Sequence, residues 1–143
     1  MRHLLGVAEE RGLWVEWDPR LGENLWGYTD VPARTIILNS HMSVTRQKYA
    51  LAHELGHAWH NHSWTGRPHE DATAERLADE HAARLLIDPA AFVRAEQLVG
   101  PHAGAIALEL DTVAEVVTIW QRLLRKVPRV GYATPLRCTD RIA

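Results

Sequence analysis

The segment YALAHELGH, residues 49–57, contains the pattern His-Glu-x-x-His, and the rest of the chain is interpreted around it. On a helix, His53 and His57 are four residues apart, so both imidazoles lie on one face, one turn from each other. Two neutral imidazoles at that spacing suit two corners of a tetrahedral zinc site. Glu54 lies off that line but within reach of a metal-bound water, whose proton a carboxylate can accept during attack on a carbonyl. Residues 50–59 contain no proline and no β-branched side chain, which favours the helix.

The composition leaves room for coincidence, because the chain of 143 residues has nine histidines. For such a composition, a chance His-Glu-x-x-His is expected at roughly a few per cent, the usual weakness of a short motif. A catalytic zinc site also needs a third protein ligand. The interpretation therefore depends on a suitable side chain elsewhere in the chain.

Glu75 is the candidate for that third ligand and follows His57 by 18 residues. This separation leaves room for one helix to end and for a second helix to return alongside it. Glu75 and Asp79 share a face with alanine and leucine in the segment ERLADEHAARLL, residues 75–86, where an acidic pair is unusual for a core. Asp79 could accept a hydrogen bond from the free ring nitrogen of a ligand histidine. The alternative is a solvated acidic face, because residues 70–80 hold further acidic side chains.

Length and composition predict a single domain over residues 1–143. Hydrophobic residues make up 46% of the chain, charged residues 24%, and the formal net charge is −2, which gives no general case for nucleic-acid binding. The single Cys138 excludes an intramolecular disulfide framework and favours a reducing compartment. The first residues are too short an apolar run for a signal peptide, and no run is long enough to span a membrane. We therefore expect a cytoplasmic protein with no membrane partner.

The predicted elements are one helix, three strands and then mostly helices, which is an α+β fold. Ser43 is the expected N-cap of the active-site helix. The sequence therefore predicts a small three-stranded sheet packed on that helix, followed by a helical C-terminal half. The expected strands are residues 13–17, 25–28 and 34–39, and the expected helices are residues 1–11, 44–60, 70–87, 90–99, 103–110 and 112–126.

Four stretches, taken together, resemble the ImmA/IrrE metallopeptidases, which are gluzincins. The match covers residues 34–89 and is specific as a set. The stretches are IILN at residues 36–39, Arg46 with Tyr49, AHELGH at residues 52–57, and Glu-x-x-Ala-Asp-x-x-Ala-Ala-x-Leu-Leu-x-x-Pro from Glu75 to Pro89.

The resemblance implies a zinc metallopeptidase of minimal gluzincin-like fold, with residues 34–89 as the metal-site core. It assigns His53, His57 and Glu75 as the ligands of one Zn²⁺ ion. It assigns Glu54 as the catalytic residue that activates the zinc-bound water. It also implies a protein or peptide substrate, namely a repressor-like regulator of a mobile element or phage.

Two further expectations follow from the resemblance. His81 departs from the family, which usually has phenylalanine at this position, and we interpret it as a polar residue of the pocket wall. In gluzincins the strand before the active-site helix, here residues 35–39, lies at a sheet edge. An extended substrate can add to such an edge by backbone pairing.

The competing interpretation is a regulatory protein- or DNA-binding module with a structural zinc site and no turnover. Residues 105–123 have the cadence of a helix-turn-helix, and a basic tail follows at residues 127–143. From residue 122 onward the formal charge is +5, against −7 for the rest. Acidic side chains within the helix-turn-helix stretch oppose phosphate contacts, and the family has a degenerate region of this kind. We therefore favour packing for this stretch and expect no nucleic-acid partner.

Other side chains are candidates that also have simpler explanations. Tyr49 could donate to an oxyanion, although core packing explains it as well. His60, one turn past the motif, could bind the metal or contact carbonyls at the helix end. His62 and His69 could line a cleft or belong to surface loops, and Trp64 could contact substrate.

Overall fold

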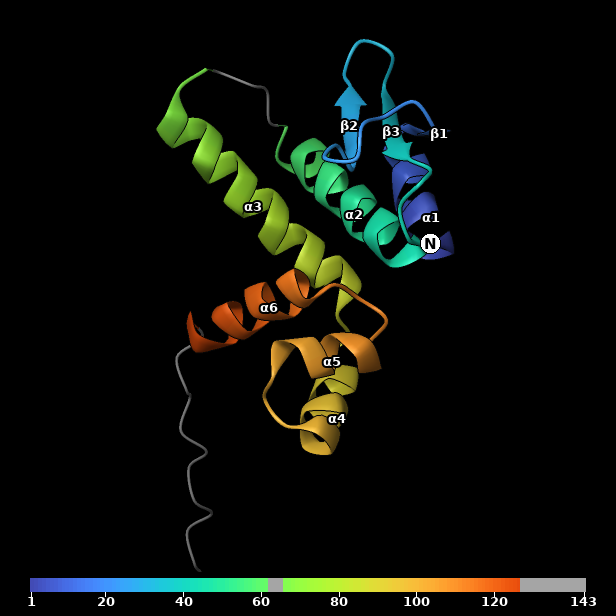
Figure 1. The fold of residues 1–143 in the computed structure, drawn as a ribbon. Helices are drawn as coiled ribbons and strands as arrows, with labels where there is room; N and C mark the ends of the chain where they lie inside the picture. The colour runs from blue at the N-terminus through green and yellow to red at the C-terminus, as the bar shows by residue number, and fades with distance from the viewer. Residues whose placement is uncertain (62–65, 127–143) are drawn as a thin grey trace, which may run out of the picture.

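The computed structural model of the chain describes residues 1–61 and 66–126 (Figure 1). Within these residues the fold is the expected α+β arrangement of a three-stranded sheet and a helical C-terminal half. The predicted basic tail, residues 127–143, and the candidates His62 and Trp64 lie outside the described residues. The elements are α1 (Arg2–Glu10), β1 (Trp14–Asp18), β2 (Gly27–Asp30), β3 (Thr35–Asn39), α2 (Val44–His60), α3 (Pro68–Leu86), α4 (Pro89–Val99), α5 (Ala103–Glu109) and α6 (Ala114–Lys126).

Helix α2 is the central element and has packed neighbours on two sides. Figure 1 shows the sheet against one side of α2 and the long helix α3 along the other. The helix begins as predicted, because the Ser43 hydroxyl accepts a hydrogen bond of 3.3 Å from the backbone N–H of Arg46. It ends at Asn61, whose left-handed backbone (φ 53°) closes the last turn. Packing on both sides holds the histidines of α2 in place relative to the sheet and to α3.

The order of strands in the sheet is β1-β3-β2, so β3 is the central strand. It pairs in parallel with β1 and antiparallel with β2, and its Ile36 and Leu38 side chains are fully buried. The prediction that residues 35–39 lie at a sheet edge is therefore wrong. The most apolar of the three strands is buried by pairing on both of its edges, and this leaves β1 and β2 as the edge strands.

Strand β2 also differs from its prediction, because it begins and ends two residues later than residues 25–28. Thr29 and Asp30 pair with residues 36 and 35 of β3 and so belong to the strand, although the predicted strand ended before them. The register places Gly27 and Thr29 on the same face as the buried Leu38 and Ile36. Both β2 residues consequently face α2.

Asn39, at the end of β3, fixes the loop between β1 and β2. Its side-chain amide is buried and donates hydrogen bonds of 3.4, 3.1 and 3.0 Å to the carbonyls of Leu21, Gly22 and Leu25. A buried amide that finds carbonyl partners in a loop holds that loop against the fold. The same loop continues to Trp26, which lies beside the candidate site described below.

Two glycines allow α2 to approach its neighbours closely. A Cβ atom at Gly27 would lie 2.8 Å from the carbonyl oxygen of Ile37 and 3.7 Å from the Cβ of Ala50. A Cβ atom at Gly56 would lie 2.7 Å from both the Cα and the carbonyl oxygen of Ala78 in α3. Only glycine fits at Gly56, and this contact brings α3 against the face of α2 that carries the histidines.

The substitution Gly56→Ala should therefore destabilise the fold by about 1–3 kcal/mol, the usual cost of overpacking a rigid contact. Chemical denaturation of the metal-free chain measures this difference. Gly104→Ala is the matched control, because a Cβ atom there would have no neighbour within 4 Å. In a helix the control change should be neutral or stabilising. Equal stability of Gly56→Ala and wild type would contradict the close α2–α3 contact.

The core has two parts that meet at α3. The first lies between the sheet, α1 and α2 and includes Leu51 and Ala82, and the second lies among α3–α6 and includes Ala83 and Ile106. Adjacent alanines of α3 thus face different clusters, so α3 joins the two parts. Within the described part of the chain, none of the helices combines the length and apolar character needed to cross a bilayer.

Candidate metal centre

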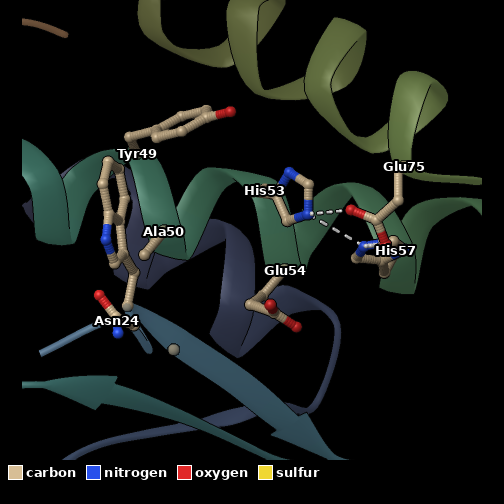
Figure 2. Close-up of a pocket in the computed structure, with 9 residues that line it drawn as sticks. Asn24, Tyr49, Ala50, His53, Glu54, His57 and Glu75 are labelled. Atoms are coloured by element: carbon tan, nitrogen blue, oxygen red, sulfur yellow. Dashed lines mark hydrogen bonds and ion pairs between the residues drawn. The ribbon is translucent and has the colours of Figure 1, made fainter. Parts of the chain in front are cut away.

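Three side chains from two helices converge next to the sheet. Figure 2 shows His53 and His57 of α2 turned toward Glu75 of α3. The Nε2 atoms of His53 and His57 are 3.1 Å apart. The carboxylate of Glu75 reaches both rings, with Oε2 at 3.2 Å from Nε2 of His53 and Oε1 at 3.3 Å from Nε2 of His57. The predicted spacing of 18 residues thus brings the carboxylate to both imidazoles.

These three residues fit a metal ion of the expected kind. Two imidazoles and one carboxylate form the protein part of many catalytic zinc sites. With zinc–ligand bonds of about 2.0–2.1 Å, neighbouring ligand atoms of a tetrahedron lie about 3.3 Å apart. The two Nε2 atoms are 3.1 Å apart, and each has a different oxygen of Glu75 at 3.2 or 3.3 Å, which is close to that value. The group could therefore hold a metal ion without rearrangement of the helices.

The site is open to solvent on one side. The side chains of His53 and His57 retain 19% and 20% of their exposure, whereas Glu75 retains 52%. A cavity of about 390 Å³ adjoins the three residues and is lined further by Asn24, Trp26, Gly27, Tyr49, Ala50 and Glu54. A ligand can therefore reach the convergent atoms from this cavity.

Asp79 lies one turn after Glu75, and the contact predicted with one of the two histidines is made with His53. Its Oδ1 is 2.9 Å from Nδ1 of His53, the ring nitrogen that points away from Glu75. The same oxygen accepts a hydrogen bond of 2.8 Å from the hydroxyl of Tyr49. With Nδ1–H donating to Asp79, the His53 tautomer leaves the Nε2 lone pair free to bind a metal. The hydroxyl of Tyr49 thus supports Asp79 in this structure.

Burial and the neighbouring charges shift the pKa values of His53 and Asp79 in opposite directions. Burial disfavours the charged form of His53, but the hydrogen bond and charge of Asp79 outweigh it and raise the pKa of His53. Burial lowers the pKa of His57, and the neighbouring charge on His53 lowers it further. Burial tends to raise the pKa of Asp79, but the hydrogen bonds from His53 and Tyr49 keep it below its usual value. Asp79 is therefore ionised at neutral pH and can accept both bonds.

Glu54 points away from α3, toward strand β2 (Figure 2). Its Oε2 accepts a hydrogen bond of 2.6 Å from the hydroxyl of Thr29. Sequence reasoning missed Thr29 because the predicted strand ended at residue 28. The alternation of side chains along β2 could have indicated that Thr29 faces α2, but only once the register of β2 with β3 is known. Thr29 holds the carboxylate of Glu54 between the sheet and the convergent histidines.

Among the described residues, the other histidine candidates, His60, His69 and His81, do not belong to this group. His69 lies in the first turn of α3, where its carbonyl accepts a hydrogen bond from Thr73. The ring of His81 packs on Trp59 with ring centroids 5.1 Å apart, and on His60 with centroids 6.0 Å apart. His81 therefore belongs to an aromatic contact between α2 and α3 and not to the wall of the cavity beside Glu54, where it was expected.

The C-terminal helices pack on α3 and α2. The connection between α5 and α6 is anchored by Asp111, which accepts hydrogen bonds from Thr45 and Lys48 of α2. Helix α6 buries Val116 and Val117 in the second core cluster. This packing accounts for the apolar periodicity of residues 105–123.

Replacing Asp79 by alanine should weaken zinc binding by roughly 10- to 100-fold, the usual cost of losing a residue that orients a ligand histidine. Asp79→Asn should cost less, because its amide oxygen can still accept the bond from Nδ1 of His53. Competition with a chromogenic chelator measures both affinities. An Asp79→Ala chain with wild-type zinc affinity would remove Asp79 from the site.

Comparison with known proteins adds one finding to this geometry. A family model named Peptidase_M78 and described as the IrrE N-terminal-like domain matches residues 8–115. The matched range contains the sheet, α2, α3 and all the convergent side chains. A comparison with curated proteins found no match.

Proposed function

The chain belongs to the Peptidase_M78 family, the IrrE N-terminal-like domain, and from this premise we propose that it is a zinc-dependent endopeptidase that cleaves a specific regulator or repressor protein. One observation carries the proposal. One candidate ligand atom from each of three residues lies within 4.8 Å of the others, beside a cavity that is also lined by the acidic side chain of Glu54. In this proposal His53, His57 and Glu75 bind one zinc ion, Asp79 orients His53, and Glu54 is catalytic.

A zinc ion held by these residues would supply Lewis acidity for the scissile carbonyl and lower the pKa of the attacking water. Glu54 takes the proton of that water on its carboxylate and later gives it to the leaving amine. The hydroxyl of Thr29 holds one oxygen of Glu54, at 2.6 Å, and leaves the other oxygen for the proton. Asp79 keeps the ring of His53 in one tautomer throughout.

The substrate would bind as an extended segment along β2. This strand is at an edge of the sheet, and its Gly27 and Thr29 face α2 and the cavity. The backbone of an extended peptide can pair with the free edge of such a strand. This places the expected backbone pairing on β2 instead of β3, directly beside Glu54.

The experiment that tests the proposal presents the zinc-loaded chain with the products of neighbouring genes, above all any repressor-like protein. Mass spectrometry should find one or a few discrete cleavage sites in one of these proteins. Generic substrates such as casein are expected to stay intact, because regulatory peptidases depend on one partner. A chain that holds zinc and binds such a partner without cutting it would support the competing interpretation, a regulatory module with a structural zinc site.

Thr29→Val should reduce kcat by about 5- to 20-fold, the effect of one lost charge-assisted hydrogen bond on a positioned carboxylate. Valine keeps the shape and the strand preference of threonine, so fold and zinc content should not change. Thr29→Ser, which keeps a hydroxyl, should recover part of the loss. Thr29 is then a positioning residue that acts through Glu54. Wild-type kcat in Thr29→Val would contradict this role.

A further inference from the structure

A second pocket lies beside the proposed metal centre, at the ends of β2 and α2. It has a volume of about 230 Å³. Its lining includes His57 of the proposed centre and Thr29, which donates a hydrogen bond to Glu54. We call it the arginine pocket. Its other lining residues are Arg11, Leu13, Val31, Arg34, Ala58 and Asn61.

The two pockets differ in charge. The cavity beside the histidines includes two acidic residues, Glu54 and Glu75, in its lining, whereas the arginine pocket is lined by two arginines and by no acidic residue. Over residues 1–61 and 66–126, neither Arg11 nor Arg34 has a carboxylate within 4.0 Å. Paired guanidinium groups at a concave site are suited to bind a carboxylate.

Both guanidinium groups are held in place by neutral partners. That of Arg34 donates to the carbonyls of Arg11 and Gly12, at 2.6 and 3.0 Å. The guanidinium of Arg11 lies 3.9 Å from the ring centre of Trp59. The contacts of Arg34 explain this residue as a cap for the end of α1. Arg11 lines the pocket and does not cap the helix through its side chain, so Arg11 is the residue that tests a binding role.

The pocket lies where a side chain of an extended substrate would reach it. Thr29 contacts Glu54, and Val31, two residues further along the chain, lines the arginine pocket. Thr29 lines the pocket itself, and Val31 is the first residue after the end of β2 at Asp30. Successive residues of an extended peptide advance by roughly 3.3 Å. A substrate paired with β2 therefore presents a side chain to the pocket about two residues from the segment opposite Thr29.

We propose that the arginine pocket binds an aspartate or glutamate side chain of the substrate, within about two residues of the cleaved bond and on one side of it only. The inference rests on the proposed function, because it assumes that a peptide lies along β2. It adds an acidic residue at a defined place to the requirements for the substrate.

The test is a cleavage profile with overlapping synthetic peptides that cover the candidate partner proteins. Each peptide is also made with Asn or Gln, and with Lys, in place of its acidic residues, and mass spectrometry identifies the cut bonds. The zinc-loaded wild-type chain should favour Asp or Glu over Asn or Gln at one position by about tenfold, as expected for a charge-assisted hydrogen bond. Arg11→Gln should reduce that preference to about twofold or less. Arg11→Glu should turn it toward Lys and Arg. Arg94→Gln is the control, because it also removes one positive charge, at an exposed position on α4. It should keep the wild-type cleavage profile.

A second arm separates this inference from the proposed function. The zinc-loaded Glu54→Gln chain is mixed with the same set of peptides, and the retained peptides are identified, with and without Arg11→Gln. Retention of acidic peptides that depends on Arg11, without any cleavage by wild type, supports the pocket and contradicts the peptidase. Cleavage without an acidic preference, or with one that Arg11→Gln leaves intact, overturns the pocket and keeps the peptidase. If acidic peptides are preferred neither in cleavage nor in retention, and no peptide is cut, the result contradicts both the pocket and the peptidase.

Discussion

Replacing Glu54 by glutamine will abolish peptide cleavage and leave the zinc site intact. The amide has the same shape and can still accept the 2.6 Å hydrogen bond from Thr29, but it cannot take a proton from the attacking water. General base catalysis contributes about 10²- to 10⁴-fold. We expect kcat/KM for the true partner to fall by at least about 10³-fold, with zinc content and melting temperature unchanged.

Kinetics with the purified partner and elemental analysis of the same protein sample check this expectation together. Glu16→Gln is the control, because Glu16 is an exposed carboxylate on β1 and does not line the cavity beside the histidines. Its activity should match wild type. Cleavage that persists in Glu54→Gln would assign the proton transfer to another group, and persistence under chelation as well would indicate a contaminating protease.

The loss of Glu75 should have the largest effect on metal binding. Glu75→Ala removes one of three protein ligands, so zinc affinity should fall by more than about 100-fold, beyond the cost of a supporting residue. A ligand that binds only the folded chain, at a free concentration of about 10³ times Kd, stabilises that chain by about 4 kcal/mol, and we expect this gain for wild type with zinc. For a chain of this size that gain corresponds to a rise in Tm of roughly 10 °C, which the variant should lack.

Thermal unfolding with and without excess zinc measures this difference directly. Glu96→Ala, an exposed change on α4, is the matched control and should respond to zinc as wild type does. His53→Ala and His57→Ala should behave like Glu75→Ala. Full zinc response in Glu75→Ala would mean that a different side chain is the third ligand, and the gluzincin assignment would be wrong.

The parts of the site that could be predicted from sequence are those set by helical periodicity. His53, His57 and Glu54 lie within one segment, and Asp79 follows Glu75 by one turn, so their relative directions follow from helix geometry alone. The pairing of the two helices was inferred from the separation of 18 residues between His57 and Glu75 and from the resemblance to a family. Spacing also predicted that Asp79 contacts one of the two histidines, and the structure shows that this one is His53, at 2.9 Å.

The parts that could not be predicted depend on pairing between distant residues. The central position of β3 in the sheet could not be predicted, because nothing local to residues 35–39 specifies their neighbours. Thr29 reaches Glu54 only through the register of β2 on β3. Arg11 and Arg34 lie at one pocket because Arg34 binds the end of α1, 23 residues earlier in the chain.

In the proposed mechanism, peptide cleavage depends on a zinc ion held by His53, His57 and Glu75. The most direct test is cleavage of its partner by the metal-free chain, measured by mass spectrometry before and after zinc is added stepwise. We expect no cleavage without metal and full activity at about one equivalent of zinc per chain, because a single three-ligand site binds one ion. Cleavage by the metal-free chain, or none at any zinc concentration with a partner that binds, would contradict it.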